Sequence, residues 1–275
     1  MDNRPIGVFD SGLGGLTAVR ELSRLLPGED IIYFGDTGRV PYGGRSRQTI
    51  IKYARQDANF LSSFELKIIL VACGTVSSTA LDIVAAESSL PVVGVVRPAS
   101  QRAAELSRTG RIGLIGTQAT IRTGAYERHI TTLRPEAELI SQPCPLFVPL
   151  VENGRFRPGD VVIETVVREY LQPLKDRTVD TLVLGCTHYP LLREVIAAFM
   201  GPEVQLVDSG AEGARRTADR LRSMDALADP GRPGACRYYV SDSTEGFAQL
   251  ASVFLQRDVN EQVQQIEIEN FDSGI

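Results

Sequence analysis

Two segments of the chain end in the same way: Ile68-Ile69-Leu70-Val71-Ala72-Cys73-Gly74-Thr75 and Leu182-Val183-Leu184-Gly185-Cys186-Thr187-His188. In each, an apolar run typical of a buried parallel strand stops at a cysteine, and small polar residues follow. Ligands of open α/β sheets bind just beyond the carboxyl ends of such strands. We therefore expect two thiols, one from each half of the chain, to face one pocket. This arrangement suits a reaction that removes a proton on one side and returns it on the other.

Around these segments, strand-like apolar runs alternate with amphipathic stretches of helical length, which is the pattern of a doubly wound α/β protein. The pattern begins with Pro5-Ile6-Gly7-Val8-Phe9-Asp10-Ser11 and restarts with the similar Arg111-Ile112-Gly113-Leu114-Ile115-Gly116-Thr117. This weak internal duplication places Cys73 and Cys186 at comparable positions in two halves. The expected strands are 6–9, 31–34, one ending at Cys73, 92–96, one ending at Cys186, 204–207 and 237–240. The expected helices are 16–26, 47–64, 160–171, 211–224 and 244–255.

The sequence thus predicts an α/β fold of two pseudosymmetric, doubly wound domains with mainly parallel sheets and the active site in the interdomain cleft. The chain is expected to cross between the domains near residues 97–98 and again near 208–210. Residues 1–97 plus 209–275 then form a discontinuous first domain, and residues 98–208 form the second. The acidic, polar stretch from Glu261 is expected to be a loose tail.

The composition of the 275 residues is that of an ordinary soluble enzyme, with 43% apolar and 23% charged residues. A net charge of −5 gives no electrostatic support for nucleic-acid binding. No apolar run approaches the roughly 20 residues needed to span a membrane, and the N-terminus lacks a signal-peptide pattern. We expect a cytoplasmic protein with reduced thiols and with neither nucleic-acid nor membrane partners.

The cysteines are Cys73, Cys144, Cys186 and Cys236, and none forms a C-x-x-C pair. The sequence therefore lacks the cysteine pattern that would indicate a zinc-ribbon or thioredoxin-type site. Cys144 and Cys236 are expected to be small buried hydrophobes. A zinc site of Cys73, Cys186 and His188 remains an alternative, although no second local cluster of ligands accompanies it. We expect no metal and no cofactor.

Polar groups surround the two predicted thiols. The turn at residues 10–15 lacks both the Lys-Ser/Thr of a Walker motif and the spacing of a dinucleotide loop. Its backbone N–H groups and Ser11 suit a small carboxylate instead. The residues that add hydroxyl and amide groups near the thiols are Thr75, Ser77, Ser78 and Thr187.

Two further features suit proton transfer and ligand closure. His188 is expected to hold Cys186 as a thiolate or to relay its proton, and Asp10 to do the same for Cys73. Tyr42-Gly43, in a long loop, is expected to close over a ligand.

With these motifs in place, the chain resembles the cofactor-independent aspartate/glutamate racemase family, and within it the glutamate racemases. The resemblance covers essentially the whole chain. It rests on Gly7-Val8-Phe9-Asp10-Ser11-Gly12-Leu13-Gly14-Gly15-Leu16, Pro41-Tyr42-Gly43, Ala72-Cys73, Val151-Glu152-Asn153-Gly154 and Gly185-Cys186-Thr187-His188-Tyr189-Pro190-Leu191-Leu192.

The resemblance implies that Cys73 takes the proton from D-glutamate and Cys186 takes it from L-glutamate. Asp10 and His188 would assist the adjacent thiols, with Glu152 nearby. The substrate-binding residues that it implies are Asp10, Ser11, Pro41, Tyr42, Gly43, Gly74, Thr75, Thr187 and His188. It also implies a reaction without pyridoxal phosphate, metal or nucleotide, a homodimer, and a supply of D-glutamate for peptidoglycan synthesis.

One position departs from the family pattern, because Gly74 stands where the family usually has asparagine. The missing amide is expected to leave space beside the substrate, so that Gly74→Asn adds one hydrogen bond and lowers the KM for glutamate. A steric clash is the competing expectation, if neighbouring atoms fill that space.

Three other functions remain open from the residues themselves. Aspartate racemase is the nearest alternative in the same class. A thiol redox switch and a non-catalytic acidic amino-acid-binding protein are the alternatives from other classes.

Overall fold

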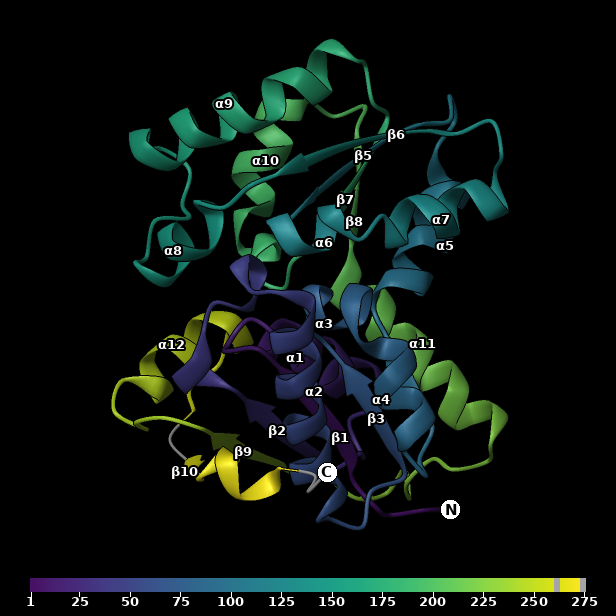
Figure 1. The fold of residues 1–275 in the computed structure, drawn as a ribbon, viewed down its shortest axis with the longest axis vertical. Coiled ribbons are helices and arrows are strands. Elements are labelled where there is room, and N and C mark those ends of the chain that lie inside the picture. Colours follow the sequence, from purple (N-terminus) through teal and green to yellow (C-terminus); the bar gives the residue numbers. More distant parts are fainter. Residues whose placement is uncertain (260–262, 273–275) are drawn as a thin grey trace.

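A computed structural model of the protein describes residues 1–259 and 263–272, and they form two parallel sheets with helices on their faces (Figure 1). The first sheet has the strand order β10-β9-β2-β1-β3-β4, and the second has the order β6-β5-β7-β8. The strands of the first sheet are β1 (Ile6–Asp10), β2 (Ile31–Gly35), β3 (Ile68–Val71), β4 (Val92–Gly94), β9 (Cys236–Val240) and β10 (Val263–Gln265). Those of the second are β5 (Arg111–Gly116), β6 (Glu138–Pro143), β7 (Thr181–Leu184) and β8 (Gln205–Asp208).

Helices connect the strands in both domains. Those near the first sheet are α1 (Leu16–Leu25), α2 (Arg47–Ser62), α3 (Gly74–Thr79), α4 (Leu81–Glu87), α11 (Ser209–Ser223) and α12 (Phe247–Leu255), with the 3₁₀ turns η1 (Thr37–Arg39), η2 (Tyr42–Gly44) and η4 (Ile268–Phe271). Those near the second sheet are α5 (Val96–Leu106), α6 (Gln118–Arg122), α7 (Ala125–Leu133), α8 (Phe147–Glu152), α9 (Val161–Asp176), α10 (Arg193–Met200) and the 3₁₀ turn η3 (Tyr189–Leu192). None of the helices within these described ranges is both long and apolar enough to cross a membrane.

The expected fold class is confirmed, including its pseudosymmetry. Strands β2-β1-β3-β4 of the first sheet have the same order along the chain and across the sheet as β6-β5-β7-β8 of the second. All of the pairings are parallel, so the carboxyl ends of the strands share one edge in each sheet. Figure 1 shows the two domains stacked with these edges directed toward each other.

The strands agree with the predicted domain division. Every strand of the first sheet lies within residues 1–97 or 209–275, and every strand of the second lies within 98–208. Helix α5 spans the predicted boundary at residue 97. The exact domain boundaries therefore stay a prediction.

Several predicted elements differ from the observed ones by two or more residues, and the helix predicted over 160–171 continues to Asp176 as α9. The fourth strand ends at Gly94 rather than at Val96, because Val96 already begins α5. The helix expected from Thr244 starts at Phe247, after Gly246 in a left-handed conformation (φ 74°).

The expectation of a loose tail is wrong for residues 263–272, whereas Glu261 itself lies outside the described residues. Strand β10 pairs in parallel with β9, and Val263 lies opposite Tyr238. Turn η4 then packs on α2, where the rings of Phe60 and Phe271 lie 5.1 Å apart. The polar composition of the segment concealed its few apolar anchors, among which Ile268 is fully buried.

The strand that leads to Cys186 is anchored at its start by one carboxylate. Asp180 accepts hydrogen bonds from Ser107 Oγ at 2.7 Å, from Arg108 N at 2.8 Å, and from Thr109 N at 2.6 Å. Burial opposes ionisation, but these hydrogen bonds prevail and lower the pKa of Asp180 to about 2. Asp180 thus ties the turn before β5 to the start of β7.

We predict that Asp180→Asn lowers the free energy of unfolding by about 1.5–3 kcal/mol at pH 7, because an amide nitrogen cannot accept these hydrogen bonds. Since the folded pKa lies below the unfolded value, the contribution of Asp180 is complete above about pH 4 and disappears as the pH falls toward 2. Urea unfolding at pH 7 and at pH 3 measures both effects. Asp219→Asn, which removes an exposed ion pair with Arg222, is the control and should change stability by less than about 1 kcal/mol. If Asp180→Asn and Asp219→Asn lose equal amounts of unfolding free energy, the stabilising role of the Asp180 hydrogen bonds is contradicted.

Candidate functional site

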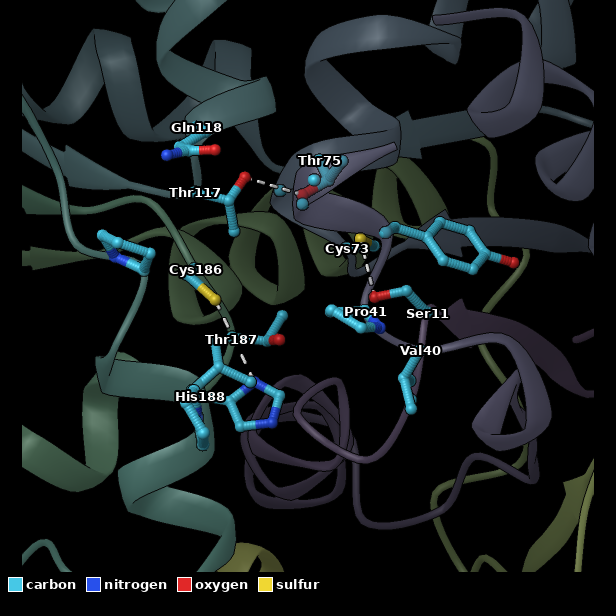
Figure 2. Close-up of a pocket in the computed structure, with 18 of the residues that line it drawn as sticks. Ser11, Val40, Pro41, Cys73, Thr75, Thr117, Gln118, Cys186, Thr187 and His188 are labelled. Carbon is cyan, nitrogen blue, oxygen red and sulfur yellow. Dashed lines mark hydrogen bonds between the residues drawn. The ribbon is translucent and has the colours of Figure 1, made fainter. Parts of the chain in front are cut away.

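A cavity of about 340 Å³ lies between the two domains, where the carboxyl ends of the central strands of both sheets meet. Figure 2 shows side chains from both domains directed into it. The predicted site residues that line it are Ser11, Pro41, Tyr42, Gly43, Cys73, Gly74, Thr75, Glu152, Cys186, Thr187 and His188. Among the residues that the structure describes, no lysine or arginine lines the cavity.

The first thiol stands just after β3. Cys73 caps the N-terminus of α3, and its Sγ donates to Ser11 Oγ across 3.3 Å. Burial, together with the charge on Asp10, raises the pKa of Cys73 to about 12. The sulfur is therefore a protonated thiol at neutral pH.

Asp10, a predicted site residue, does not line the cavity. It is fully buried, and its Oδ2 accepts a hydrogen bond from Gly15 N at 2.9 Å. Burial raises the pKa of Asp10, and the charge on His188 opposes this shift. Its other oxygen, Oδ1, has no hydrogen-bond partner among the described residues. Asp10 is thus placed to act on Cys73 rather than to contact a ligand.

The second thiol stands just after β7 and has a different partner. Cys186 Sγ lies 4.0 Å from His188 Nδ1, and His188 Nε2 lies 2.9 Å from Glu152 Oε1. Burial lowers the pKa of His188, but the contacts with Cys186 and Glu152 outweigh it and raise that pKa to about 10. At neutral pH the imidazole is therefore a cation held between a sulfur and a carboxylate.

Glycines allow the two domains to approach each other closely around the cavity. A Cβ built on Gly74 would lie closer to Gly185 O than the 3.0 Å that real Cβ atoms keep. A Cβ on Gly43 would lie 2.7 Å from Thr117 Cβ, and one on Gly14 would lie 2.6 Å from His188 Nδ1. At these three positions of the first domain, atoms of the second domain occupy the space that a side chain would need.

The expected open space beside Gly74 is therefore absent. The atom nearest to the built Cβ is a backbone carbonyl oxygen, which cannot move aside as a flexible side chain can. The favoured expectation that Gly74→Asn adds a hydrogen bond is wrong for this geometry, and the competing steric expectation applies.

Several hydroxyl groups are placed differently from the prediction. Tyr42 lines the cavity, but its hydroxyl contacts Asp36 and Asp57, neither of which lines it. Ser77 Oγ donates to Val71 O at 2.9 Å, and Ser78 Oγ donates to Thr75 O at 3.1 Å, so both are occupied with the backbone around α3.

Sequence reasoning missed cavity residues in the second domain. Thr117 and Gln118 line the cavity, and Thr117 Oγ1 lies 3.0 Å from Thr75 Oγ1 across the domain boundary (Figure 2). The internal duplication carried the signal for Thr117, because this residue aligns with Ser11. Cys144, expected to be only a buried hydrophobe, is indeed buried but also lines the cavity.

No group of three or more histidine, cysteine, aspartate or glutamate side chains in residues 1–259 and 263–272 is arranged to hold a metal ion. The set of Cys73, Cys186 and His188 that the zinc alternative requires is therefore not assembled as a ligand cluster in this geometry.

Comparison with known proteins gives a consistent result. The family model described as Asp/Glu/Hydantoin racemase matches residues 19–217. A glutamate racemase from Geobacter metallireducens is 47% identical over 92% of this chain and 93% of its own length. A glutamate racemase from Lactococcus lactis is 43% identical over 98% of both chains.

Solved structures agree with this result. The crystal structure of glutamate racemase from Francisella tularensis in complex with D-glutamate matches with a TM-score of 0.90 and 39% identity, over 98% of this chain and 100% of that one. The two thiols at one cavity, the duplicated scaffold and these matches lead to one conclusion: the chain belongs to the Asp/Glu racemase family and is an isomerase.

Proposed function

We propose that the protein is a glutamate racemase that interconverts L- and D-glutamate with two cysteines as its acid and base, without a cofactor. One observation carries the proposal: Cys73 and Cys186 reach the same cavity from equivalent strand ends of the two domains. Two groups that approach a carbon from different domains can remove its proton on one face and return a proton on the other.

The protonation states of Cys73 and His188 suit one direction of turnover. Cys73, with a pKa of about 12, is a proton donor at neutral pH. Protonated His188 lies 4.0 Å from Cys186 Sγ, where it stabilises negative charge on that sulfur. We infer that Cys186 removes the α-proton of L-glutamate and that Cys73 delivers its proton to the opposite face. The reverse reaction requires Cys73 to lose its proton when D-glutamate is bound.

Neutral groups are proposed to bind the substrate. The hydroxyl groups of Ser11, Thr75 and Thr187 line the cavity, and so does the backbone of Gly43 and Gly74. Hydrogen bonds from such donors stabilise the charge that develops on the α-carboxylate as the proton leaves. Asp10 acts from behind Cys73, and Glu152 orients His188.

The relatives at 43–47% identity are glutamate racemases, which favours glutamate over aspartate as the substrate. We propose that the product D-glutamate serves peptidoglycan synthesis in the cytoplasm and that the enzyme works as a homodimer. Sedimentation of the purified protein measures the last point.

The overall test is an assay of the purified protein in D₂O after exhaustive dialysis against EDTA and treatment with a carbonyl reagent that traps pyridoxal. We expect optical rotation to decay with L- and with D-glutamate, and α-deuterium to enter the product, because side chains carry out every proton transfer. Turnover of aspartate alone would instead support an aspartate racemase. Activity that disappears on chelation and returns with zinc would support the metal alternative.

Single replacements test the two thiols. Cys73→Ala and Cys186→Ala should each lower racemisation by at least about 10²–10⁴-fold, because each removes one of two groups that work on opposite faces. Cys236→Ala is the control, since Cys236 is only half-buried and lies outside the cavity. Circular dichroism establishes that the variants are folded. Full turnover by folded Cys186→Ala would disprove the two-thiol mechanism.

Gly74→Asn tests the close approach of the domains. We expect kcat/KM for both enantiomers to fall by roughly tenfold or more, because the new Cβ meets Gly185 O and pushes Cys186 away from Cys73. Gly44→Ala is the matched control, since a Cβ built there meets no atom within 4 Å. A lower KM in Gly74→Asn would contradict this expectation, because it would show that the two domains can separate to fit the side chain without loss of activity.

A further inference from the structure

A buried cluster of charged and polar side chains adjoins the loop that carries Pro41 and Gly43, and the proposed reaction does not use it. It consists of Asp36, Arg39, Tyr42, Gln56 and Asp57, and we call it the loop cluster. Both carboxyl groups are fully buried. Three of its members come from the segment between β2 and α2, and the other two come from α2 itself.

Arg39 joins the two carboxyl groups of the loop cluster. Its Nε donates to Asp36 Oδ2 at 2.6 Å, and its Nη2 donates to Asp57 Oδ1 at 3.1 Å. Its Nη1 donates to Gln56 Oε1 at 2.5 Å. The guanidinium also stacks over the ring of Tyr53, with 4.1 Å between its carbon and the ring centre. One cation therefore serves two carboxyl groups that have no access to water.

The contacts of the Tyr42 hydroxyl show that one of the two carboxyl groups in the loop cluster is protonated. Tyr42 Oη lies within hydrogen-bonding distance of Asp36 Oδ2, and it lies 3.1 Å from Asp57 Oδ2. A phenol has one hydrogen and can donate it to only one of these oxygens. Both contacts are hydrogen bonds only if one of the two carboxyl groups carries a proton.

Asp57 is the better candidate for that proton. Asp36 has further donors, because Ser241 Oγ donates to its Oδ1 at 2.6 Å while Arg39 and Tyr42 contact its Oδ2. Within the described part of the chain, the hydrogen-bond partners of the Asp57 carboxyl group are Arg39 and Tyr42 alone. Burial first, and then the charge on Asp36, raises the pKa of Asp57 well above its usual range, while Arg39 opposes the shift. A protonated Asp57 donates to Tyr42 Oη, and Tyr42 in turn donates to Asp36.

We propose that Asp57 is a positioning residue that acts as a neutral carboxylic acid and holds Tyr42, and with it the backbone of Pro41 and Gly43, at the wall of the substrate cavity. Tyr42 is 1% exposed and directs its hydroxyl into the loop cluster, while Tyr42 itself and the residues on either side of it line the cavity. The identity of the substrate rests on the proposed function, but the protonation and the anchoring do not.

Kinetics of three variants test the anchoring. Asp57→Asn retains one acceptor for Arg39 and one donor for Tyr42, so its KM should stay within about threefold of the wild type. Asp57→Ala removes both, and its KM should rise by roughly tenfold or more, with a smaller change in kcat. Asp36→Asn, the matched replacement at the other carboxyl group of the loop cluster, should behave like Asp57→Ala. If Asp57→Asn is as impaired as Asp57→Ala, the neutral-acid proposal is wrong.

Two measurements test the proposal without using activity. The infrared spectrum of the wild type at neutral pH should contain the C=O band of a protonated carboxylic acid, and Asp57→Asn should lack it. Hydrogen exchange of residues 37–46 should be faster in Asp57→Ala than in the wild type or in Asp57→Asn, while the second domain is unchanged. A wild type without the band, or equal exchange in all three proteins, would overturn the proposal. If the band is present but glutamate is not racemised, the proposed function fails alone.

Discussion

The site depends on one steric constraint, which is that three glycines bring the backbone of the first domain close to atoms of the second domain. Gly74 faces Gly185, Gly14 faces the Thr187-His188 turn, and Gly43 faces Thr117. Thr75 and Thr117 add a polar contact between the domains at 3.0 Å. A cavity of about 340 Å³ with a thiol from each domain requires this proximity, since a side chain at any of these glycines would widen the gap.

The duplicated scaffold carries unlike chemistry in its two halves. Ser11 and Thr117 are equivalent hydroxyl residues, and Cys73 and Cys186 are equivalent thiols. The groups next to the thiols, however, break the symmetry. Gly116 stands where the first domain has Asp10, and Thr75 stands where the second domain has His188. An acid therefore adjoins one sulfur and a cation adjoins the other, so equivalent positions have opposite electrostatic surroundings.

The sequence predicted the features that depend on local pattern. Apolar runs that stop at Cys73 and Cys186 marked the strand ends, and the repeated first strand marked the duplication. Contacts between segments that are distant along the chain could not be predicted from the sequence. Nothing near Gly74 indicates that Gly185 O occupies the adjacent space, and Asp57 looks like one polar position on an amphipathic helix. The recognisable motif around Tyr42 predicts a contact with the substrate, although the tyrosine hydroxyl belongs to the loop cluster.

The aromatic packing of η4 makes the end of the described chain part of the support for the cavity wall. Helix α2 carries Asp57 on one side, while its Asn59 Nδ2 donates to Phe271 O at 3.1 Å and its Phe60 packs on the Phe271 ring. Residues that look dispensable by composition thus brace the helix to which the substrate loop is fastened. Removing the chain from Ile268 onward, or fusing a bulky partner close to Phe271, would disturb catalysis from the far side of the domain.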